Sequence, residues 1–356
     1  MLCFDCRHCD HCIACTQLQH QSYCILNQPV SEQEFERVRT SITQSRKAFD
    51  DLSAAFYALK YSTPHRSSLQ INCINSTGND LYNCKNASIC FNCRNVEDSK
   101  YMFDLGNDRD SMDCYEHGWL VQSELIYESH AGMASYHLLF CHLCANSRDL
   151  LYCDTCPQHN SNLFGCISMK QAKYCILNKQ YTKEEYEDLV PKIIARMRED
   201  GEWGEFFPVA MSTFAYNATT AQEYFPLTKE EALKRGWKWQ DQTDEMPKVD
   251  RVIPATQLPD SIDDIPDDIL NWAITCEATK RPFKIIKQEL EFYRNMRLPV
   301  PHFHPDERHR RRMALRNPRK LWNRECAKCK KPISTSYAPE RPEIVYCEEC
   351  YLREVY

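Results

Sequence analysis

The amino-acid sequence predicts a mainly β protein with flanking helices. In this fold class, a short-rung β-solenoid, built from a duplicated cysteine-rich unit plus an amphipathic helix, is followed by a degenerate finger and a C-terminal zinc ribbon. Three observations support the prediction. One cysteine-rich unit occurs twice, cysteines and apolar residues recur about every 12 residues, and four cysteines near the C-terminus form two C-x2-C pairs. Repetition of this kind is the sequence signature of solenoids.

These features divide the 356 residues into five parts. We expect a truncated first cysteine-rich repeat with helices, a β-solenoid closed by a capped helix, an aromatic strap with an acidic linker, a degenerate finger with a basic helix, and the zinc ribbon. In that order, the expected boundaries are 1–62, 63–200, 201–270, 271–318 and 319–356.

The duplicated unit ends in the same motif in both copies. Tyr-Cys-Ile-Leu-Asn occupies residues 23–27 and 174–178, at an offset of 151, and a cysteine stands eight residues before the motif each time. Across 22 aligned positions, 8 are identical. Each copy continues with a capping box, which begins at Ser31 or Thr182, and with apolar residues at helical spacing. We therefore expect an amphipathic helix after each motif.

Residues 71–178 carry the pattern of a solenoid. Pairs of apolar residues recur along this stretch, and the last four, which begin at Ile126, Leu139, Leu151 and Leu163, are 12 or 13 residues apart. Asn, Ser, Asp and Gly fill the intervals, as the corners of a coil require. Equivalent residues should therefore stack in successive coils.

The cysteines of the repeated units allow two interpretations. Cys141-x2-Cys144 and Cys153-x2-Cys156 have a spacing that suits a zinc knuckle. Earlier coils carry Tyr, Ile and Leu at equivalent positions, which favours an inward ladder of core residues. The five cysteines of residues 3–15 fall at every third position, a period that suits neither a helix face nor a regular strand. A packed core is favoured there over an iron–sulfur cluster, whose usual fourth spacing and following proline are missing.

Cysteine usage limits the class of protein. The chain has 22 cysteines, no apolar signal segment follows Met1, and no stretch approaches 18 consecutive apolar residues. We expect a cytoplasmic, reducing location, cysteines that serve as metal ligands or core residues, and no membrane span.

The motif most specific for a cofactor is C-x2-C-x17-C-x2-C, at Cys326, Cys329, Cys347 and Cys350. Two tight turns with this spacing present four thiolates, the usual tetrahedral ligand set of Zn²⁺ inside cells. Because all four ligand positions are filled, the expected zinc is structural and has no open position for a water. We expect the β-prone residues around 334–346 to form the hairpins that present the two turns.

Upstream lie Cys276-x2-Thr279 before a Phe, an acidic and aromatic helix, and His304-x2-Glu307 after a Pro. Residues 272–312 thereby resemble a family of small, probable zinc-binding fingers with a C-x2-C pair at both ends. Here Thr279, His304 and Glu307 stand where that family has ligands. Since Thr is a poor zinc ligand, the resemblance implies a finger that has lost its metal, with residual binding by Cys276 and His304 as the alternative.

The charge of −6 is unevenly distributed. Residues 280–331 hold 17 Lys and Arg against five acidic residues, whereas residues 241–270 hold nine acidic residues against two bases. A phosphate backbone is a natural partner of the basic segment, and pairing with the acidic stretch is the alternative. We expect part of the segment to line one helix face. The candidate nucleic-acid-binding residues are Arg308, Arg310, Arg311, Arg312, Arg316, Arg319 and Lys320.

The sequence contains no catalytic signature. It has only eight glycines, no glycine-rich phosphate loop, no H-E-x-x-H motif and no nucleophile motif. We therefore expect a non-enzymatic, zinc-containing scaffold that presents the solenoid and the ribbon to a macromolecular partner, in the first place a protein. The alternative is a nucleic-acid-binding protein that uses residues 294–331 and the zinc ribbon.

Several short motifs are distributed over most of the chain. They are Asn72-Cys73, the Asn-Ser-Thr-Gly-Asn-Asp run at 75–80, the Tyr-Cys-Ile-Leu-Asn motif, Gly-Glu-Phe-Phe-Pro at 204–208 and Tyr-Cys-Glu-Glu-Cys-Tyr at 346–351. Together they resemble a family of cysteine-rich repeat and zinc-ribbon proteins from uncultured bacteria and giant viruses. The resemblance implies no particular activity. Some members carry a CoA-transferase label, which no residue of this chain supports.

Overall fold

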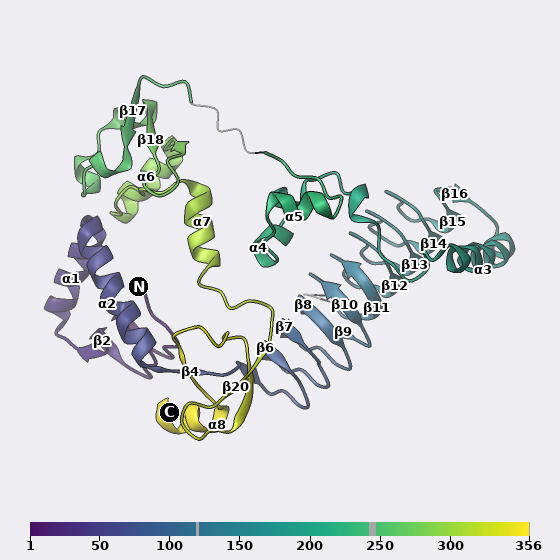
Figure 1. Ribbon diagram of the computed structural model, residues 1–356, viewed down its shortest axis with the longest axis horizontal. Coiled ribbons are helices and arrows are strands. Elements are labelled where there is room, and N and C mark those ends of the chain that lie inside the picture. The colour runs from purple at the N-terminus through teal and green to yellow at the C-terminus, as the bar shows by residue number, and fades with distance from the viewer. Residues whose placement is uncertain (119–120, 242–246, 356) are drawn as a thin grey trace.

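The computed structural model describes residues 1–118, 121–241 and 247–355 (Figure 1). These residues form a β-rich fold with eight flanking α-helices and no closed barrel. Its longest part is a row of short strands that leads away from the N-terminal unit and ends at α3 (Lys183–Asp200). The β-rich fold with flanking helices is thus as predicted.

The row of strands is a single 12-stranded sheet, which we call the stack. Neighbouring strands pair in parallel, except that the last, β16, is antiparallel to β15. β9 lies off this path, because β8 pairs directly with β10 and β9 pairs with β11. The strands are β5 (Gln70–Ile71), β6 (Gly78–Tyr82), β7 (Cys90–Arg94), β8 (Lys100–Gly106), β9 (Asp108–Arg109), β10 (Met112–Tyr115), β11 (Ser123–His130), β12 (Tyr136–Leu139), β13 (Arg148–Leu151), β14 (Ser161–Phe164), β15 (Lys173–Ile176) and β16 (Lys179–Gln180).

The register of the stack keeps the expected period of 12 or 13 residues, but at two coils it is shifted by one residue from the sequence pattern, because Leu138 and Leu150 take the places expected for Leu139 and Leu151. Ile126 pairs with Leu138, Leu138 with Leu150, and Leu150 with Leu163. Each of these side chains is at most 1% exposed. Because most coils place an aliphatic residue or a cysteine at equivalent inward points, these side chains lie above one another in one continuous core.

A left-handed corner at every third residue sets the shape of each coil. This backbone conformation is unfavourable for L-residues by about 1 kcal/mol or more each, and hydrogen bonding and packing between neighbouring coils must offset it. A coil of 12 residues contains four such three-residue steps. In the coil that ends at β13, φ is 49–58° at Ala134, His137, Phe140, Leu143 and Asn146.

The residue after each corner points into the stack. In the same coil these inward residues are Leu138, Cys141, Cys144 and Ser147, none of which is more than 5% exposed. The rule also explains the three-residue spacing near the N-terminus, where φ is positive at the residue before each cysteine of 3–15. Small thiol side chains fit this narrow interior.

The buried thiols also satisfy backbone carbonyl groups. Cys141 Sγ donates to the carbonyl oxygens of Leu139 and Leu150, both at 3.4 Å. Ser147 Oγ occupies an equivalent position and donates to Ala145 at 2.9 Å and to Cys156 at 3.4 Å. Cysteine therefore combines an apolar surface with a weak donor, which a purely aliphatic residue lacks.

The duplicated motif closes a coil in both copies. The side chain of Asn27 accepts from the N–H of Thr16 and donates to its carbonyl group, at 2.8 and 2.9 Å. Asn178 makes the same two hydrogen bonds with Ile167, at the same distances. This asparagine binds backbone groups of the preceding coil, and the chain then turns back into the short antiparallel strand β3 (Gln28–Pro29) or β16.

The N-terminal unit repeats the end of the stack on a smaller scale. It comprises β1 (Asp10–Ile13), β2 (Ser22–Ile25), β3 (Gln28–Pro29), α1 (Glu32–Gln44) and α2 (Arg46–Ser62). As predicted, Ser31 caps α1, and a full capping box between Thr182 and Glu185 begins α3.

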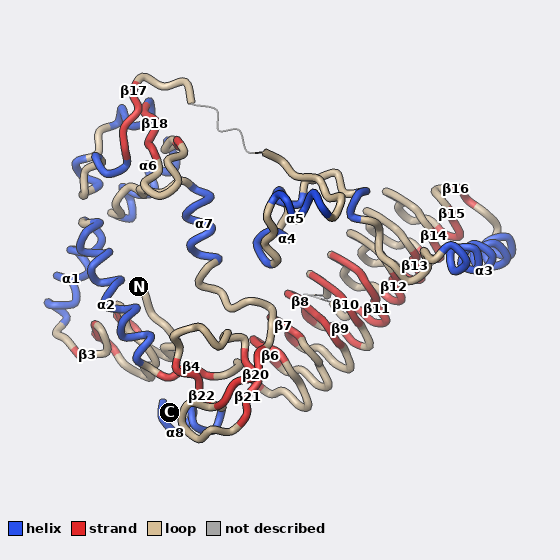
Figure 2. The backbone as a smooth tube through the Cα atoms, viewed as in Figure 1, coloured by secondary structure: helices blue, strands red, loops and turns tan. Residues whose placement is uncertain are grey.

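The remaining elements follow the stack in the sequence (Figure 2). Residues 201–241 form only short helices, namely α4 (Ala221–Tyr224), α5 (Lys229–Lys234) and the 3-10 turns at Val209–Met211 and Tyr216–Ala218. The finger region comprises β17 (Arg251–Pro254), β18 (Trp272–Thr275), β19 (Pro282–Phe283), α6 (Lys287–Met296) and α7 (Pro305–Met313), with 3-10 turns at Ala255–Gln257, Ile262–Asp264 and Asp267–Asn271.

The C-terminal ribbon is completed by a strand from the other end of the chain. It consists of β20 (Trp322–Glu325), β21 (Pro332–Thr335), β22 (Ile344–Tyr346) and α8 (Glu348–Val355). β20 and β21 form the predicted hairpin, but β22 instead pairs in parallel with β4 (Pro64–Arg66). The second predicted hairpin is therefore wrong, because β4 supplies the hydrogen-bonding partner of β22.

Replacing Gly78 by Ala is expected to destabilise the stack by about 3 kcal/mol or more. Gly78 has φ +139°, and a Cβ atom would lie 2.8 Å from the carbonyl carbon of Cys90 and nearer still to its oxygen. Gly204 is the control, because its φ is +101° and a Cβ atom there meets nothing within 4 Å. Urea unfolding of both variants measures the difference, and equal losses would contradict the steric explanation.

Candidate metal centre and basic segment

The four ribbon cysteines converge on one point. Cys326 follows β20, Cys347 joins β22 to α8, and Cys350 lies in the first turn of α8. All four Sγ atoms lie within 4.8 Å of one another. The sulfurs of Cys329 and Cys347 are 3.7 Å apart. Cys329 is exposed and the other three side chains are buried.

Backbone hydrogen bonds hold the first pair of ligands in a tight turn. The N–H of Cys326 donates to the carbonyl group of Lys331, and the N–H of Lys330 donates to Cys326, both at 2.9 Å. Lys330 takes the left-handed conformation, with φ 63°. The turn is tied to the second pair of ligands because the N–H of Ala327 donates to Val345 at 2.9 Å.

The backbone around Cys326 favours its thiolate form. Burial raises the pKa of this thiol, but N–H groups of Cys329, Cys347 and Lys328 outweigh that effect and lower its pKa to about 6. Burial and the neighbouring thiols raise the pKa of Cys350 to about 12. N–H groups aimed at a sulfur stabilise negative charge on it, as they do in thiolate metal sites.

The ligand set fits a tetrahedral metal ion. With metal–sulfur bonds of about 2.3 Å, neighbouring sulfurs in a tetrahedral site are about 3.8 Å apart. The 3.7 Å between Cys329 and Cys347 agrees with this spacing. Within residues 1–118, 121–241 and 247–355, no other group of three or more His, Cys, Asp or Glu side chains brings its ligand atoms together in this way. The cluster can therefore hold a metal ion.

The finger region has the same backbone frame as the ribbon. The N–H of Cys276 donates to Arg281 at 2.9 Å, and the N–H of Lys280, with φ 61°, donates to Cys276 at 3.0 Å. The N–H of Glu277 donates to His302 at 3.0 Å, just as Ala327 donates to Val345 in the ribbon. Each bond recurs at the matching position, so the two regions share one arrangement of paired turns.

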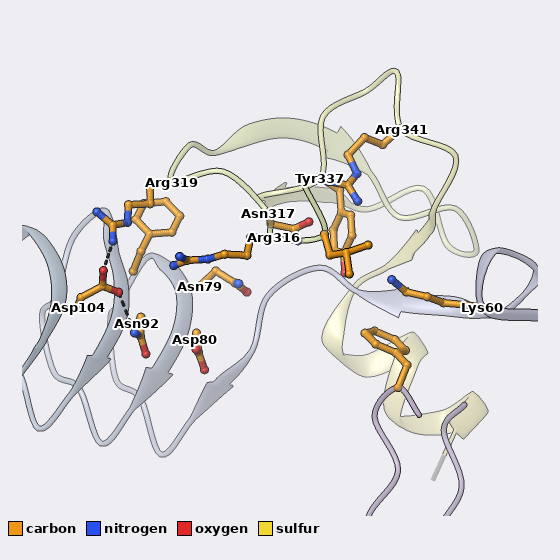
Figure 3. Close-up of a pocket in the computed structure, with 13 residues that line it drawn as sticks. Lys60, Asn79, Asp80, Asn92, Asp104, Arg316, Asn317, Arg319, Tyr337 and Arg341 are labelled. Carbon is orange, nitrogen blue, oxygen red and sulfur yellow. Dashed lines mark hydrogen bonds and ion pairs between the residues drawn. The ribbon is translucent and has the colours of Figure 1, made fainter. Parts of the chain in front are cut away.

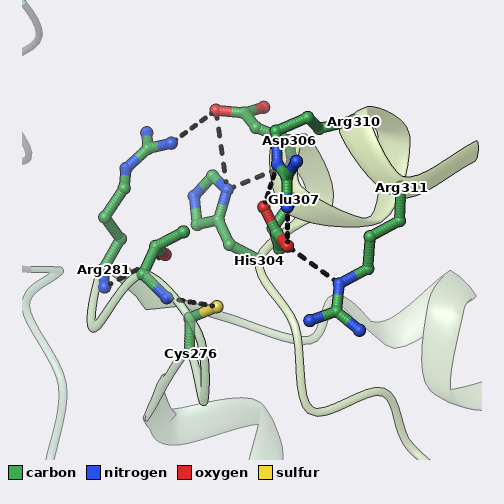
Figure 4. A network of polar contacts seen from close by, with 8 residues as sticks. Cys276, Arg281, His304, Asp306, Glu307, Arg310 and Arg311 are labelled. Carbon is green, nitrogen blue, oxygen red and sulfur yellow. Dashed lines mark hydrogen bonds and ion pairs between the residues drawn. The ribbon is translucent and has the colours of Figure 1, made fainter. Parts of the chain in front are cut away.

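A polar network occupies the ligand positions of the finger (Figure 4). The N–H of Thr279 donates to Cys276 Sγ at 3.5 Å. His304 Nδ1 accepts from the N–H of Asp306 at 3.2 Å and so caps α7. The carboxylate of Glu307, only 4% exposed, accepts from both Arg310 and Arg311 at 2.7–2.8 Å.

These contacts engage Glu307 with arginines, and the expected loss of metal from the finger stays a prediction. Arg310 and Arg311 lower the pKa of Glu307 to about 2, so its carboxylate stays charged and bound to them. Cys276 and His304, the alternative pair, are not part of any metal-ligand group in the described residues. Arginines on α7 thus supply the positive charge that faces the Glu307 carboxylate.

The predicted basic residues fall into three groups: those paired with acidic residues of the finger region, Arg319, which is paired with the stack, and those without a carboxylate partner in the described residues. Arg308 contacts Glu289 at 3.1 Å, and Arg310 and Arg311 are held by Glu307. Arg319 is bound to Asp104 in the stack, with its guanidinium 3.8 Å from the ring centre of Tyr224.

The other three basic residues have no carboxylate partner in the described residues. Arg316 donates to the Tyr224 hydroxyl at 2.6 Å, Lys320 lies over the ring of Trp322, and Arg312 is exposed.

One expectation about the basic segment is wrong, and the alternative of pairing with the acidic stretch is realised at one position among the described residues. α7 ends at Met313, so Arg312, Arg316 and Arg319 cannot line one helix face. Most of the segment's ion pairs also involve acids outside the stretch 241–270. Asp267, which binds Arg294 at 2.6 Å, is the exception among the described residues. Residues 242–246 of that stretch lie outside the described residues.

The structure also separates the two interpretations of the other cysteines. Cys141, Cys144, Cys153 and Cys156 belong to the core of the stack, as the ladder interpretation predicted. Near the N-terminus, burial is complete only from Cys15 onward; Cys3 is exposed, and Cys6, Cys9 and Cys12 are partly buried. The packed core expected for residues 3–15 is therefore only partly formed, because β1 is at the edge of its sheet.

Comparison with known proteins adds no functional assignment. None of the helices in the described residues has the length and apolar character needed to cross a membrane. No protein-family model matches the chain, and no curated protein is significantly similar to it. The resemblance to cysteine-rich repeat and zinc-ribbon proteins therefore stays a prediction.

Proposed function

We propose that this chain is a zinc-containing, non-enzymatic scaffold whose stack is a short-rung β-solenoid that binds a protein partner. The stepwise 12-residue register and the continuous core support the solenoid assignment. Four thiolates at tetrahedral spacing are typical of zinc rather than of harder cations, which prefer oxygen ligands. Zinc held by four cysteines has no open coordination position, so its role is structural.

The ribbon is placed to join the two cysteine-rich units. β22 pairs with β4, which lies between α2 and the first strand of the stack. The Tyr351 hydroxyl donates to Asp5 of the N-terminal unit, and Thr335 Oγ1 donates to the carbonyl group of Ser67 at 2.6 Å. By fixing the ribbon, zinc fixes both contacts and thus the relative position of the units that a scaffold presents.

The proposal of a protein partner rests on one row of aromatic and histidine rings on the stack. Tyr115, His130 and His142 follow one another on successive coils, with ring centres 5.3 and 5.1 Å apart and nearly parallel planes. The side chains of His130 and His142 are 36% and 38% exposed. Because stacking already orders these rings, a partner that covers them loses little side-chain entropy, which favours affinity.

Affinity capture with the full chain tests this function. We expect the full chain to capture a protein. The double variant His130→Ala with His142→Ala should fail to hold it. The control is His8→Ala with His20→Ala, which removes another exposed stacked pair, 5.0 Å between ring centres, in the N-terminal unit. Equal capture by both double variants would contradict the proposed surface.

Nucleic acid binding is the second candidate. It is favoured by the exposed cations Arg312, Arg316 and Lys320, which have no carboxylate partner in the described chain. The same capture experiment separates the two. Nucleic acid binding predicts that RNA or DNA is recovered at low salt and is lost both at high salt and in the Arg312→Glu variant. This outcome would support the second candidate and exclude the protein partner as the main function.

A further inference from the structure

A cavity lies where the N-terminal unit, the first coils of the stack and the ribbon meet (Figure 3). Its volume is about 280 Å³. Lys60 at the end of α2, Asn79 on β6, Arg316 in the segment before β20, and Tyr337 after β21 line it. Because these residues are far apart in the sequence, the cavity exists only in the fully assembled chain.

The lining carries an excess of positive charge. Its charged residues are Lys60, Arg316, Arg319 and Arg341 against Asp80 and Asp104. Asp104 is bound by Arg319, and Arg341 is neutralised by Glu343, whose carboxylate accepts from its Nε at 3.1 and 3.2 Å. In the described chain, this leaves Lys60 and Arg316 without a carboxylate partner, against the single carboxylate of Asp80.

Lys60 differs from an ordinary surface lysine in the surroundings of its charged group. Its ammonium group lies 4.8 Å from the ring centre of Phe4. Burial lowers the pKa of this half-buried side chain. A charge withdrawn from water without a counter-ion costs free energy, which a bound anion would offset. Arg316 differs from Lys60 because it is exposed and its guanidinium already has a neutral partner, the Tyr224 hydroxyl.

Neutral groups complete the lining. Asn79 Oδ1 accepts from the N–H of Leu69 at 2.9 Å, so the amide NH₂ of Asn79 remains as a donor. The hydroxyl of Tyr337 is 3.4 Å from Nδ1 of His65. The ring of Phe91 provides an apolar wall. Cations and an amide donor beside aromatic rings are suited to an anionic group attached to a small apolar or planar body.

We propose that this cavity binds a small organic phosphate, whose charge is balanced by Lys60 and Arg316 and whose organic part lies against the aromatic wall. A volume of about 280 Å³ accommodates such a molecule and is too small for a folded or polymeric partner. The site goes beyond the proposed scaffold function, since none of its residues belongs to the Tyr115–His130–His142 row, although Arg319 lies 4.9 Å from the ring centre of Tyr115.

Calorimetric titration of the metal-loaded full chain with phenyl phosphate tests the proposal, with benzyl alcohol as the uncharged probe. We expect phenyl phosphate to bind once per chain and benzyl alcohol not to bind. Arg316→Gln and Lys60→Met should each weaken binding about tenfold or more, because each removes a charged partner of the anion. Lys170→Gln, an exposed lysine far along the stack, should leave binding unchanged.

Three results would overturn the proposal. They are no binding at millimolar phenyl phosphate, equal weakening by Lys170→Gln, or full binding by Arg316→Gln. Lys60 is half-buried, and its replacement can affect folding. Arg316 is exposed, so the Arg316→Gln variant decides the outcome on a folded chain.

Discussion

Replacing Cys347 by Ser is expected to release the metal ion and to unfold the C-terminal ribbon. The only buried apolar cluster of the ribbon in the described residues consists of Cys326, Cys347 and Cys350, with Ile333 and Tyr346 packed against it. Such a core is too small to stabilise four short elements by burial alone. Structural zinc contributes on the order of 10–16 kcal/mol of apparent binding energy in small domains, so loss of one ligand removes most of the ribbon's stability.

The effect should extend beyond the ribbon. β22, which ends at Tyr346, pairs in parallel with β4. Unfolding of the ribbon therefore removes the hydrogen-bonding partner of β4. We expect hydrogen exchange to increase at His65 and Arg66, together with loss of the contact between Tyr351 and Asp5. The metal-to-protein ratio, measured by elemental analysis, should fall from one to zero.

A cysteine in the stack provides the matched control. Cys153 is fully buried and donates to the carbonyl group of Leu151 at 3.4 Å. Cys153→Ser should keep the metal, because a hydroxyl makes the same kind of hydrogen bond at Ser135 and Ser147. Metal retained by Cys347→Ser, or lost by Cys153→Ser, would contradict the assignment of the metal to the ribbon.

Features of the fold that depend on local spacing were predictable from the sequence. The offset between Asn27 and Asn178 revealed the duplicated unit, and the 12-residue spacing of Leu139, Leu151 and Leu163 revealed the stacked strands, although the paired residues are Leu138, Leu150 and Leu163. Both follow from repetition, which constrains geometry whatever the surroundings. The C-x2-C pairs of the ribbon were equally informative, since ligand spacing is set by the metal.

The backbone of the corners could be read from residue types only in part. Asn and Asp, which the sequence marks as corner residues, take the left-handed conformation in the first coils, for example at Asn83, Asn86 and Asn95. The left-handed corners at Phe140 and Leu143 use residues that seldom adopt this conformation. Stacking of equivalent coils holds them there, and that is a property of the assembled structure. The three-residue period near the N-terminus therefore had no interpretation in terms of a single helix or strand.

Long-range pairing was also outside the reach of sequence patterns. Nothing in the sequence near Ile344 indicates a parallel partner at Pro64. Likewise, Arg319 looked like part of an exposed basic segment, whereas its side chain is 9% exposed and bound to Asp104 of the stack. Charge counts along a chain do not reveal which acids the fold brings near, and this limit affected the candidate nucleic-acid site most.

Replacing Thr279 and Glu307 together by Cys is expected to create a second metal site in the finger. The turn at Cys276 already has the hydrogen bonds and left-handed lysine of the ribbon turn, and His304 precedes α7 as Cys347 precedes α8. With Cys276 and His304, the two new thiols complete a Cys3His set, which zinc binds as a structural ligand set. The metal-to-protein ratio should rise from one to two.

The double change does more than add ligands, because it also removes the carboxylate of Glu307. This carboxylate now holds Arg310 and Arg311, and the double variant leaves both guanidinium groups beside the new thiolates. Zn²⁺ bound by three thiolates and a neutral histidine forms a site of net charge −1. The arginines should therefore favour metal binding, and salt that screens them should weaken it. The control Thr279→Ser with Glu307→Gln removes the same carboxylate without adding thiols, and its ratio should stay at one. If the double cysteine variant folds but also keeps a ratio of one, the two regions share hydrogen bonds without sharing ligand geometry, and the finger is not a former metal site.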